Sequence, residues 1–378
     1  MITTINNKHN KLNVPNLRFP EFQGEWEKCK LGDLCNVLMC KRILASQTNT
    51  EEGVPFYKIG TIGNAPDAYI SKELFDDYKT KYNYPHKGEV MITCAGTVGK
   101  CVIYDGKDAY YQDSNIVWID NPSQCISNSF LYHLLAKVDW RKLNSTTIIR
   151  IYNDDLRNLK LSYPQIEEQQ KISRLLSFLD ERIVTQNKII DKLQSLIKGI
   201  RNDVYGKLRK SVGFNAMISD VLSYEQPQPY IVENTEYTAE GIPVLTANKA
   251  FVLGYTSEIN GIYDKGDCII FDDFTLDCKY VDFPYKIKSS AIKILTAKNK
   301  ELLRYTFEFL KYLDLSTEEH KRHYIAETQN QEFILPTMHI VSTIAHTFSA
   351  LSLRMESVVK QRNMFETQKQ YLLRQMFI

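Results

Sequence analysis

The sequence has no long hydrophobic run. No apolar stretch in its 378 residues approaches the roughly 18–20 residues that cross a bilayer. The first 13 residues are polar and contain neither the apolar region nor the cleavage site of a secretory signal. We therefore expect a cytoplasmic protein with no membrane partner.

Metal-binding patterns are also lacking. The eight cysteines are scattered without a Cys-x-x-Cys, and no spaced pair of histidines completes a zinc-binding set. We expect reduced thiols and a chain that holds no metal ion or cofactor of its own.

The sequence has no large excess of charge of either sign. The net charge is +2, and the fractions of hydrophobic (43%) and charged (24%) residues are those of an ordinary soluble protein. A protein that binds duplex DNA by itself is usually more basic. Any affinity for nucleic acid must therefore come from local basic patches or from partner proteins.

What the chain does contain is a repeat. Residues 164–205 align without a gap with residues 336–377, at a shift of 172 positions. Each copy begins with a proline and contains no other, and Gly199 is the only glycine in either copy. A larger block of mixed character precedes each copy. This layout favours two modules that each read a ligand over an enzyme with one pocket.

The first copy predicts one long helix over residues 165–209. Its apolar residues alternate at spacings of four and three, with Gln186 as the polar member of the series. The second copy keeps this pattern, although Arg362 and Lys369 stand where the first has Ile190 and Ile197. Such heptads require a partner helix, and the simplest pairing is intramolecular and antiparallel. The predicted helix-pair interface contains Ile172, Leu176, Leu179, Ile183, Ile190, Leu193, Ile344, Phe348, Leu351 and Met355.

The two blocks share anchor sequences and differ elsewhere. The first has β-rich runs at residues 88–93, 101–104 and 115–119 and a helical run at 129–138. Residues 217–222 and 265–270 of the second block repeat the anchors at 30–34 and 87–92. Two blocks that share anchor sequences but differ elsewhere are typical of two domains that bind different ligands.

These patterns predict an α+β fold with an internal pseudo-two-fold repeat. Two mixed α/β blocks are separated by two long helices that form an antiparallel coiled coil. The expected parts are an N-terminal arm (1–25), a first block (26–163), a central helix (164–209), a second block (210–334) and a C-terminal helix (335–378).

Several segments, in their order along the chain, resemble the specificity subunit of type I restriction-modification systems over nearly the whole length. Residues 14–22 (VPNLRFPEF), followed by Trp26 and LGDL, are similar to the family's opening. Residues 53–56 (GVPF) and 241–244 (GIPV) resemble its Gly-Ile-Pro strand entry, and residues 164–172 (PQIEEQQKI) its P-x-x-x-E-Q-x-x-I helix start. The second copy lacks the Glu-Gln pair, so a contact made by this pair is not expected there.

The resemblance implies that each block is a target-recognition domain that reads one half of a gapped site in double-stranded DNA. It implies that the helices separate the halves and help to dock two methyltransferase subunits and the restriction subunits. By the same resemblance this chain does no chemistry, because S-adenosylmethionine, ATP and Mg²⁺ bind to the partner subunits.

Candidate DNA contacts are polar residues in turns of the blocks. Lys and Arg neutralise phosphates or pair with guanine, and Asn and Gln pair with adenine. Ordinary solvated surface is the alternative for any single residue. The predicted DNA-binding residues are Lys41, Arg42, Lys58, Thr61, Thr97, Lys100, Gln112, Asn115 and Arg150 in the first block, and Thr246, Asn248, Lys249, Lys286, Lys288, Ser290, Lys321 and Arg322 in the second.

Two other functions stay open at this point. Asp277 and Lys279 follow an apolar run, with Asp264 and Asp267 upstream, as in metal-dependent nucleases whose carboxylates hold Mg²⁺. The simpler interpretation makes Asp272, Asp273 and Asp277 loop residues. A coiled-coil scaffold that binds other proteins is the second alternative. Residues 95–101 (AGTVGKC) are too short for a P-loop and predict a β-turn.

Overall fold

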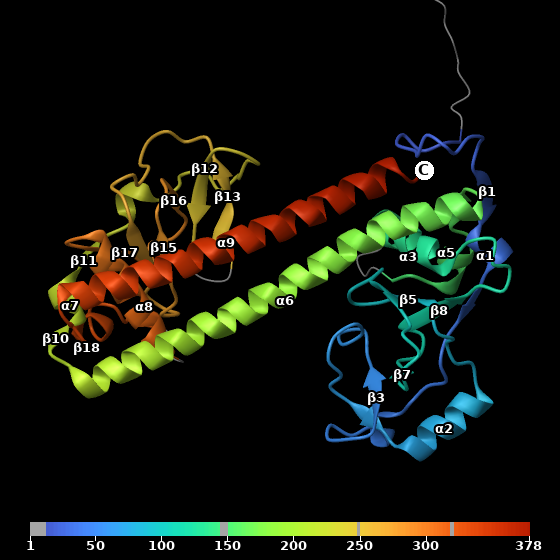
Figure 1. Cartoon of the computed structure of the whole chain (residues 1–378), viewed down its shortest axis with the longest axis horizontal. Coiled ribbons are helices and arrows are strands. Elements are labelled where there is room, and N and C mark those ends of the chain that lie inside the picture. The colour runs from blue at the N-terminus through green and yellow to red at the C-terminus, as the bar shows by residue number, and fades with distance from the viewer. Residues whose placement is uncertain (1–12, 144–149, 248–249, 318–320) are drawn as a thin grey trace, which may run out of the picture. The chain divides into compact units, whose positions relative to one another are not determined.

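The structure is a computed structural model, which describes residues 13–143, 150–247, 250–317 and 321–378 (Figure 1). The chain folds as two compact units. Unit 1 comprises residues 1–185 together with 362–378, and unit 2 comprises residues 186–361. None of the helices in the described part combines the length and apolarity that a bilayer crossing requires.

Unit 1 contains the first block. Its elements are β1 (Glu27–Lys30), α1 (Leu31–Leu34), β2 (Asn36–Leu38), the 3-10 helix Ala45–Gln47, β3 (Val54–Tyr57), β4 (Tyr69–Ile70), α2 (Lys72–Lys81), β5 (Val90–Thr93), β6 (Cys101–Ile103), β7 (Tyr110–Tyr111), β8 (Ile116–Asp120), α3 (Asn128–Lys137), α4 (Trp140–Leu143), α5 (Asn153–Arg157), β9 (Lys160–Tyr163) and the first part of α6 (Ile166–Ser211).

The strands of unit 1 form a sheet of order β2-β8-β5-β6, a sheet of order β4-β3-β7 and the pair β1-β9. β5 is the centre of the first sheet and is buried along its whole length, as expected for a continuous apolar run. β3 pairs with β4 in antiparallel and with β7 in parallel fashion. The predicted strands at 88–93, 101–104 and 115–119 and the helix at 129–138 are confirmed.

Unit 2 contains the second block. Its elements are the last part of α6, β10 (Ala216–Met217), α7 (Ile218–Val221), β11 (Leu222–Glu225), the 3-10 helix Gln228–Tyr230, β12 (Ile242–Leu245), β13 (Val252–Thr256), β14 (Cys268–Asp272), β15 (Cys278–Val281), β16 (Lys286–Ile287), β17 (Ile292–Ala297), α8 (Lys300–Leu313), the 3-10 helix Thr328–Asn330, β18 (Glu332–Phe333) and the first part of α9 (Met338–Gln375).

The second block repeats the topology of the first. Its sheets have the orders β11-β17-β14-β15 and β13-β12-β16, together with the pair β10-β18. β12 pairs with β13 in antiparallel and with β16 in parallel fashion, as β3 does with β4 and β7. The predicted internal repeat is therefore confirmed strand by strand. α2 is an addition of the first block, because the equivalent residues 257–267 form a loop.

The long helices carry the predicted apolar seam. α6 is continuous from Ile166 to Ser211, and the predicted seam residues of both helices are buried or half-buried. In unit 1 the start of α6 (Ile172, Leu176) packs in one core with the end of α9 (Leu372, Met376).

In unit 2 the order is reversed. The end of α6 contributes Tyr205 and Leu208 to a core that also contains Ile344 and Phe348 from the start of α9. Within each unit the two helices therefore run antiparallel, as predicted. Each unit thus includes parts of both long helices, whose ends complete the core of its block.

Polar networks fix these helix contacts. In unit 1, Lys369 of α9 pairs with Asp180 of α6 at 2.5 Å. In unit 2, Arg201 of α6 pairs with the buried Glu308 of α8 at 2.7 Å, and Glu308 also binds Arg304. Because Arg304 donates to Ser352 of α9 at 2.5 Å, α8 is tied to both long helices. Removal of either arginine would leave the buried carboxylate of Glu308 with less compensation for its charge, which is destabilising.

The arm that precedes the first block lies along unit 1 without a helix in its described part, residues 13–24, as predicted. Gln169, in the Glu-Gln pair of α6, accepts a hydrogen bond from Ser127 N–H at 2.8 Å and donates to the carbonyls of Cys125 and Pro164. Gln169 thereby fixes the residue that caps α3, so this part of the sequence motif has a structural role.

Candidate nucleic-acid interface

Four segments of unit 1 converge at one end of its sheets. We call residues 57–63, 94–100, 112–115 and 150–151 the first loop cluster. Gln112 N–H donates to the carbonyl of Tyr57 at 2.9 Å, and Cys94 N–H donates to that of Asn115 at 2.8 Å. Ile151 N–H donates to the carbonyl of Cys94 at 2.9 Å. Loops held to one another through their backbones form a defined surface on which polar side chains can be positioned.

The first loop cluster brings together most of the predicted contacts of the first block. Lys58 pairs with Asp67 at 3.1 Å and is 41% exposed, and Thr61 accepts from the N–H of Lys58 within the same turn. Lys100 donates to the carbonyl of Ile62 at 2.5 Å, which ties the turn after β5 to the loop after β3. Thr97 is exposed in that turn, where Gly96 and Gly99 adopt positive φ values as the predicted β-turn requires.

The remaining predicted residues of the first block lie around the segment 112–115. The side-chain oxygen of Gln112 accepts from Ile59 N–H, and Asn115 is half-buried. Arg42 pairs with Asp113 at 3.0 Å while its side chain stays 66% exposed. Arg150 donates to the carbonyl of Ser114 at 3.3 Å. Lys41 is exposed, with its ammonium over the ring of Tyr82.

Unit 2 builds an equivalent surface. We call residues 245–247, 273–277, 288–291 and 321–324 the second loop cluster, of which residue 321 onward is described. Lys288 N–H donates to the carbonyl of Leu245 at 3.2 Å, and Asp273 N–H donates to that of Ala291 at 2.9 Å. His323 N–H donates to the carbonyl of Asp273 at 3.0 Å. These three bonds match, position by position, the three that join the first loop cluster.

The predicted residues of the second block have different environments. Lys288, Ser290 and Arg322 are exposed. Thr246 is 9% exposed at the end of β12. Lys321 is half-exposed and pairs with Glu327 at 2.8 Å. Asn248 and Lys249 lie outside the described residues, as do residues 146–149 of the first block.

Lys286 requires a correction. Its side chain is only 3% exposed, its ammonium pairs with Glu258 at 2.7 Å, and it donates to the carbonyl of Asn260 at 2.7 Å. Lys286 therefore holds a loop against β16 and is not placed to reach a ligand. The sequence shows the charge of a lysine, but it does not show that the strand carrying it is buried.

The acidic residues near β15 are also structural. Asp277 pairs with Lys311 at 2.6 Å and with Lys279 at 3.1 Å; burial opposes the effect, but these lysines hold the pKa of Asp277 below its ordinary value. Asp272 ends β14 and accepts from two N–H groups of the following turn, so it is not a simple loop residue. In the part of the chain that the structure describes, no three His, Cys, Asp or Glu side chains gather as metal ligands do.

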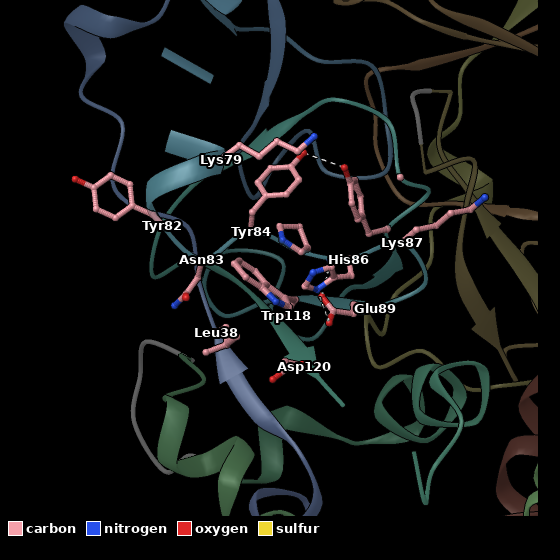
Figure 2. Close-up of a pocket in the computed structure, with 13 residues that line it drawn as sticks. Leu38, Lys79, Tyr82, Asn83, Tyr84, His86, Lys87, Glu89, Trp118 and Asp120 are labelled. Atoms are coloured by element: carbon pink, nitrogen blue, oxygen red, sulfur yellow. Dashed lines mark hydrogen bonds and ion pairs between the residues drawn. The ribbon is translucent and has the colours of Figure 1, made fainter. Parts of the chain in front are cut away.

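The first block also contains a pocket at the opposite end of β5 and β8 (Figure 2). Its volume is about 560 Å³, and Lys79, Tyr82, His86, Trp118 and Asp120 are among the residues that line it. The end of α2 and the residues that follow it form one wall. In the second block Lys265, at the position of Lys87, pairs with Glu225 at 2.8 Å, and Tyr230 donates to the same carboxylate. The pocket of the first block is lined by none of the residues of the first loop cluster.

The buried thiols are poor nucleophiles. Burial raises the pKa of Cys94 and of Cys268 to about 12, so both thiols are protonated at neutral pH. Cys125 is exposed, and all eight cysteines are free.

Comparison with known proteins finds relatives of part of the chain and a solved structure of similar fold. Residues 23–195 match the family model described as type I restriction modification DNA specificity domain. A putative type I restriction enzyme specificity subunit of Haemophilus influenzae is 48% identical over 169 residues, which cover 45% of this chain and 43% of that protein. A type I restriction enzyme specificity subunit of Escherichia coli is 43% identical over 126 residues, which cover 32% and 31%. The matched segments span less than half the length of these relatives.

The fold extends the likeness to nearly the whole chain. The crystal structure of a type I restriction-modification system S subunit from M. genitalium superposes with a TM-score of 0.67 and 15% identity, covering 97% of this chain and 99% of that one. At this identity the superposition shows a shared fold. Residues 23–195 are therefore similar to the type I restriction modification DNA specificity domain, and nearly the whole chain shares the fold of a type I S subunit.

Proposed function

We propose that this chain is the DNA sequence-recognition subunit of a type I restriction-modification complex. In this proposal each block reads one half of a gapped site in double-stranded DNA. The chain also docks two methyltransferase subunits and the restriction subunits. It performs no chemistry itself, because the partners bind S-adenosylmethionine, ATP and Mg²⁺.

One observation carries the proposal most directly: the two blocks share a backbone framework and differ in the side chains on it. Equivalent hydrogen bonds join both loop clusters, yet Gln112 of the first block corresponds to Lys288 of the second, and Asn115 corresponds to Ala291. A shared frame with different donors and acceptors is what two readers of different base sequences need, because bases are distinguished by the hydrogen-bonding pattern of their edges.

The side chains of the loop clusters suit this task. Gln112 and Asn115 can form paired hydrogen bonds with adenine, and Lys288 can bind the acceptors of guanine. Lys58, Lys100 and Arg42 stand around them in the first block, where cations set the register on the phosphates. The modest net charge of +2 fits a subunit whose DNA clamp is completed by partner proteins.

The proposal gives the long helices the task of setting the gap between the half-sites. Their seams are apolar, whereas the outward side chains Phe178, Leu353, Met364 and Tyr371 are between 53% and 66% exposed. A bound protein partner would remove these apolar side chains from water. We assign these faces to the docking of the methyltransferase subunits.

The test is methylation-sensitive sequencing of cellular DNA in the presence of the partner methyltransferase, with and without this gene. The control is the same gene carrying an early stop codon. We expect a gapped, two-part methylated motif that appears only with the intact gene. An identical methylation pattern in both strains, with the protein expressed, would contradict the proposal.

A further inference from the structure

The two blocks share one pair of polar residues within loop clusters that otherwise differ. The pair is Ser114 with Arg150 in unit 1 and Ser290 with Arg322 in unit 2. Their equivalence follows from the positions of the residues in the backbone framework of each unit, considered separately.

The shift of 172 residues that relates the long helices extends back to the caps of α3 and α8. Ser127 caps α3 by accepting from Phe130 N–H at 3.3 Å. Asn299, 172 positions later, caps α8 by accepting from Leu302 N–H at 2.7 Å. Arg150 and Arg322 are separated by the same shift and therefore occupy the same position between helix cap and long helix.

The hydrogen bonds of the loop clusters confirm this alignment. The residue after each arginine donates its N–H to the turn that follows the central strand. Ile151 donates to the carbonyl of Cys94 at 2.9 Å, and His323 donates to that of Asp273 at 3.0 Å. Each arginine is thus held at the edge of its loop cluster by an equivalent backbone bond.

The serines are equivalent by the same criterion. Cys94 N–H donates to the carbonyl of Asn115 at 2.8 Å, and Asp273 N–H donates to that of Ala291 at 2.9 Å. Ser114 directly precedes Asn115, and Ser290 directly precedes Ala291. In unit 1 the arginine reaches its serine, because Arg150 Nη2 donates to the carbonyl of Ser114 at 3.3 Å.

The residues around this pair differ between the blocks. Gln112 and Asp113 of unit 1 correspond to Lys288 and Ser289 of unit 2. Two half-sites of different sequence have different bases and identical phosphates. Residues that are the same in both blocks therefore fit the phosphates, whereas residues that differ fit the bases.

We propose that Ser114 with Arg150, and Ser290 with Arg322, are equivalent phosphate anchors, one for each half of the DNA site. The planar guanidinium presents several donors to a phosphodiester group, and the serine hydroxyl adds another. This inference rests on the proposed function. It assigns contacts with the DNA phosphates, which do not depend on base sequence, to these four residues.

The experiment measures DNA binding by the full chain assembled with its methyltransferase partner. The probes are a duplex that contains the methylated motif and a duplex of scrambled sequence, over a series of salt concentrations. The variants are Arg150→Ala, Arg322→Ala and the double variant. Arg157→Ala in unit 1 and Arg209→Ala in unit 2 are matched controls, because both residues are exposed and lie outside the loop clusters.

Each anchor variant should lose about two- to fivefold in affinity for both duplexes, as for an exposed ion pair. The slope of log affinity against log salt should fall by about 0.9 for each arginine removed, and the methylated motif should not change. Arg150→Lys and Arg322→Lys keep the charge and should retain the slope. This second pair also separates a lost phosphate contact from a lost fold.

A loss confined to the duplex with the motif would show base reading and overturn the inference. A loss in only one of the two arginine variants would overturn the equivalence, and so would binding indistinguishable from that of the control variants. Failure of the proposed function is distinguishable, because then the unaltered chain would direct no methylation to a gapped motif.

Discussion

Arg18 and Glu168 form a two-pronged ion pair across 150 residues of sequence. Nε of Arg18 lies 2.8 Å from one carboxylate oxygen of Glu168, and Nη2 lies 2.7 Å from the other. The Glu168 side chain is only 2% exposed. In the second copy of the helix Ile340 stands at the position of Glu168. The glutamate of the helix-start motif thus serves the N-terminal arm, which only the first copy has to hold.

Removal of either partner of this pair should destabilise the protein. Arg18→Ala leaves a buried carboxylate without its main partner, and hydrogen bonds to charged groups contribute about 1.5–3 kcal/mol. We expect a loss of this size in the free energy of unfolding, measured by denaturant titration. Glu167→Gln changes an exposed neighbour on α6 and is the control. An Arg18→Ala variant as stable as this control would show that the pair contributes nothing.

Two lysines separated by one residue should behave in opposite ways. Lys286→Met should lower the melting temperature, because Glu258 and the carbonyl of Asn260 lose their buried donor. Lys288→Ala should leave the melting temperature unchanged and weaken DNA binding, because Lys288 is exposed on the second loop cluster. Thermal melting and a DNA-binding titration of both variants check this. If instead Lys286→Met weakened DNA binding and left the melting temperature unchanged, Lys286 would belong to the DNA interface.

His133 should make unit 1 sensitive to acid. The residue is fully buried on α3, and neither ring nitrogen has a hydrogen-bond partner among the described residues. Burial lowers the pKa of His133 from 6.5 to about 4, with Asp180 and Lys369 as the nearby charges. Because the folded pKa is depressed, folding favours the neutral ring. Its stabilisation is complete above pH 6.5 and is lost as the pH falls towards 4.

The measurement for His133 is unfolding free energy against pH. Between pH 6.5 and 4 the unaltered protein should lose about 1.4 kcal/mol per pH unit more than His133→Leu. His346→Leu, at an exposed position of α9, is the control and should keep the full acid sensitivity. Parallel curves for the unaltered protein and His133→Leu would refute the assignment.

Lengthening both helices by one heptad should lengthen the gap of the DNA site. Seven residues inserted after Thr185 and after Gln361 add about 10.5 Å of helix to each. At about 3.4 Å per base pair this corresponds to about three base pairs. Sequencing of the methylated motif should show a longer gap between unchanged half-sites. An unaltered gap in a stable, methylation-competent variant would show that the helices do not set the distance between the half-sites.

Prediction from sequence succeeded where the signal is local or repeated. Heptad spacing predicted the long helices and their seam, and the duplicated anchors predicted a framework shared by the two blocks. The turn at residues 95–101 was predicted from its glycines. These features depend on residues close in sequence or on comparison of the chain with itself.

Prediction failed for features that depend on burial or on contacts between residues far apart in the sequence. Lys286 was expected to be exposed because lysine is charged, yet its side chain is buried in its block. Arg18 and Glu168 are too far apart in sequence for any pattern to connect them. The pocket beside the end of α2 is lined by residues from Leu38 to Asp120, which are too far apart in the sequence for a local pattern to predict it. The anchor pairs could have been found by extending the helix alignment backward to Arg150 and Arg322.

If each block reads its own half-site, exchange of one block should alter only one half of the DNA site. Residues 26–163 would be replaced by the first block of a known type I specificity subunit, and the methylated motif would be determined by sequencing. One half of the motif should change while the other half and the gap stay the same. A change in both halves, or in neither, would show that the blocks do not read the half-sites separately.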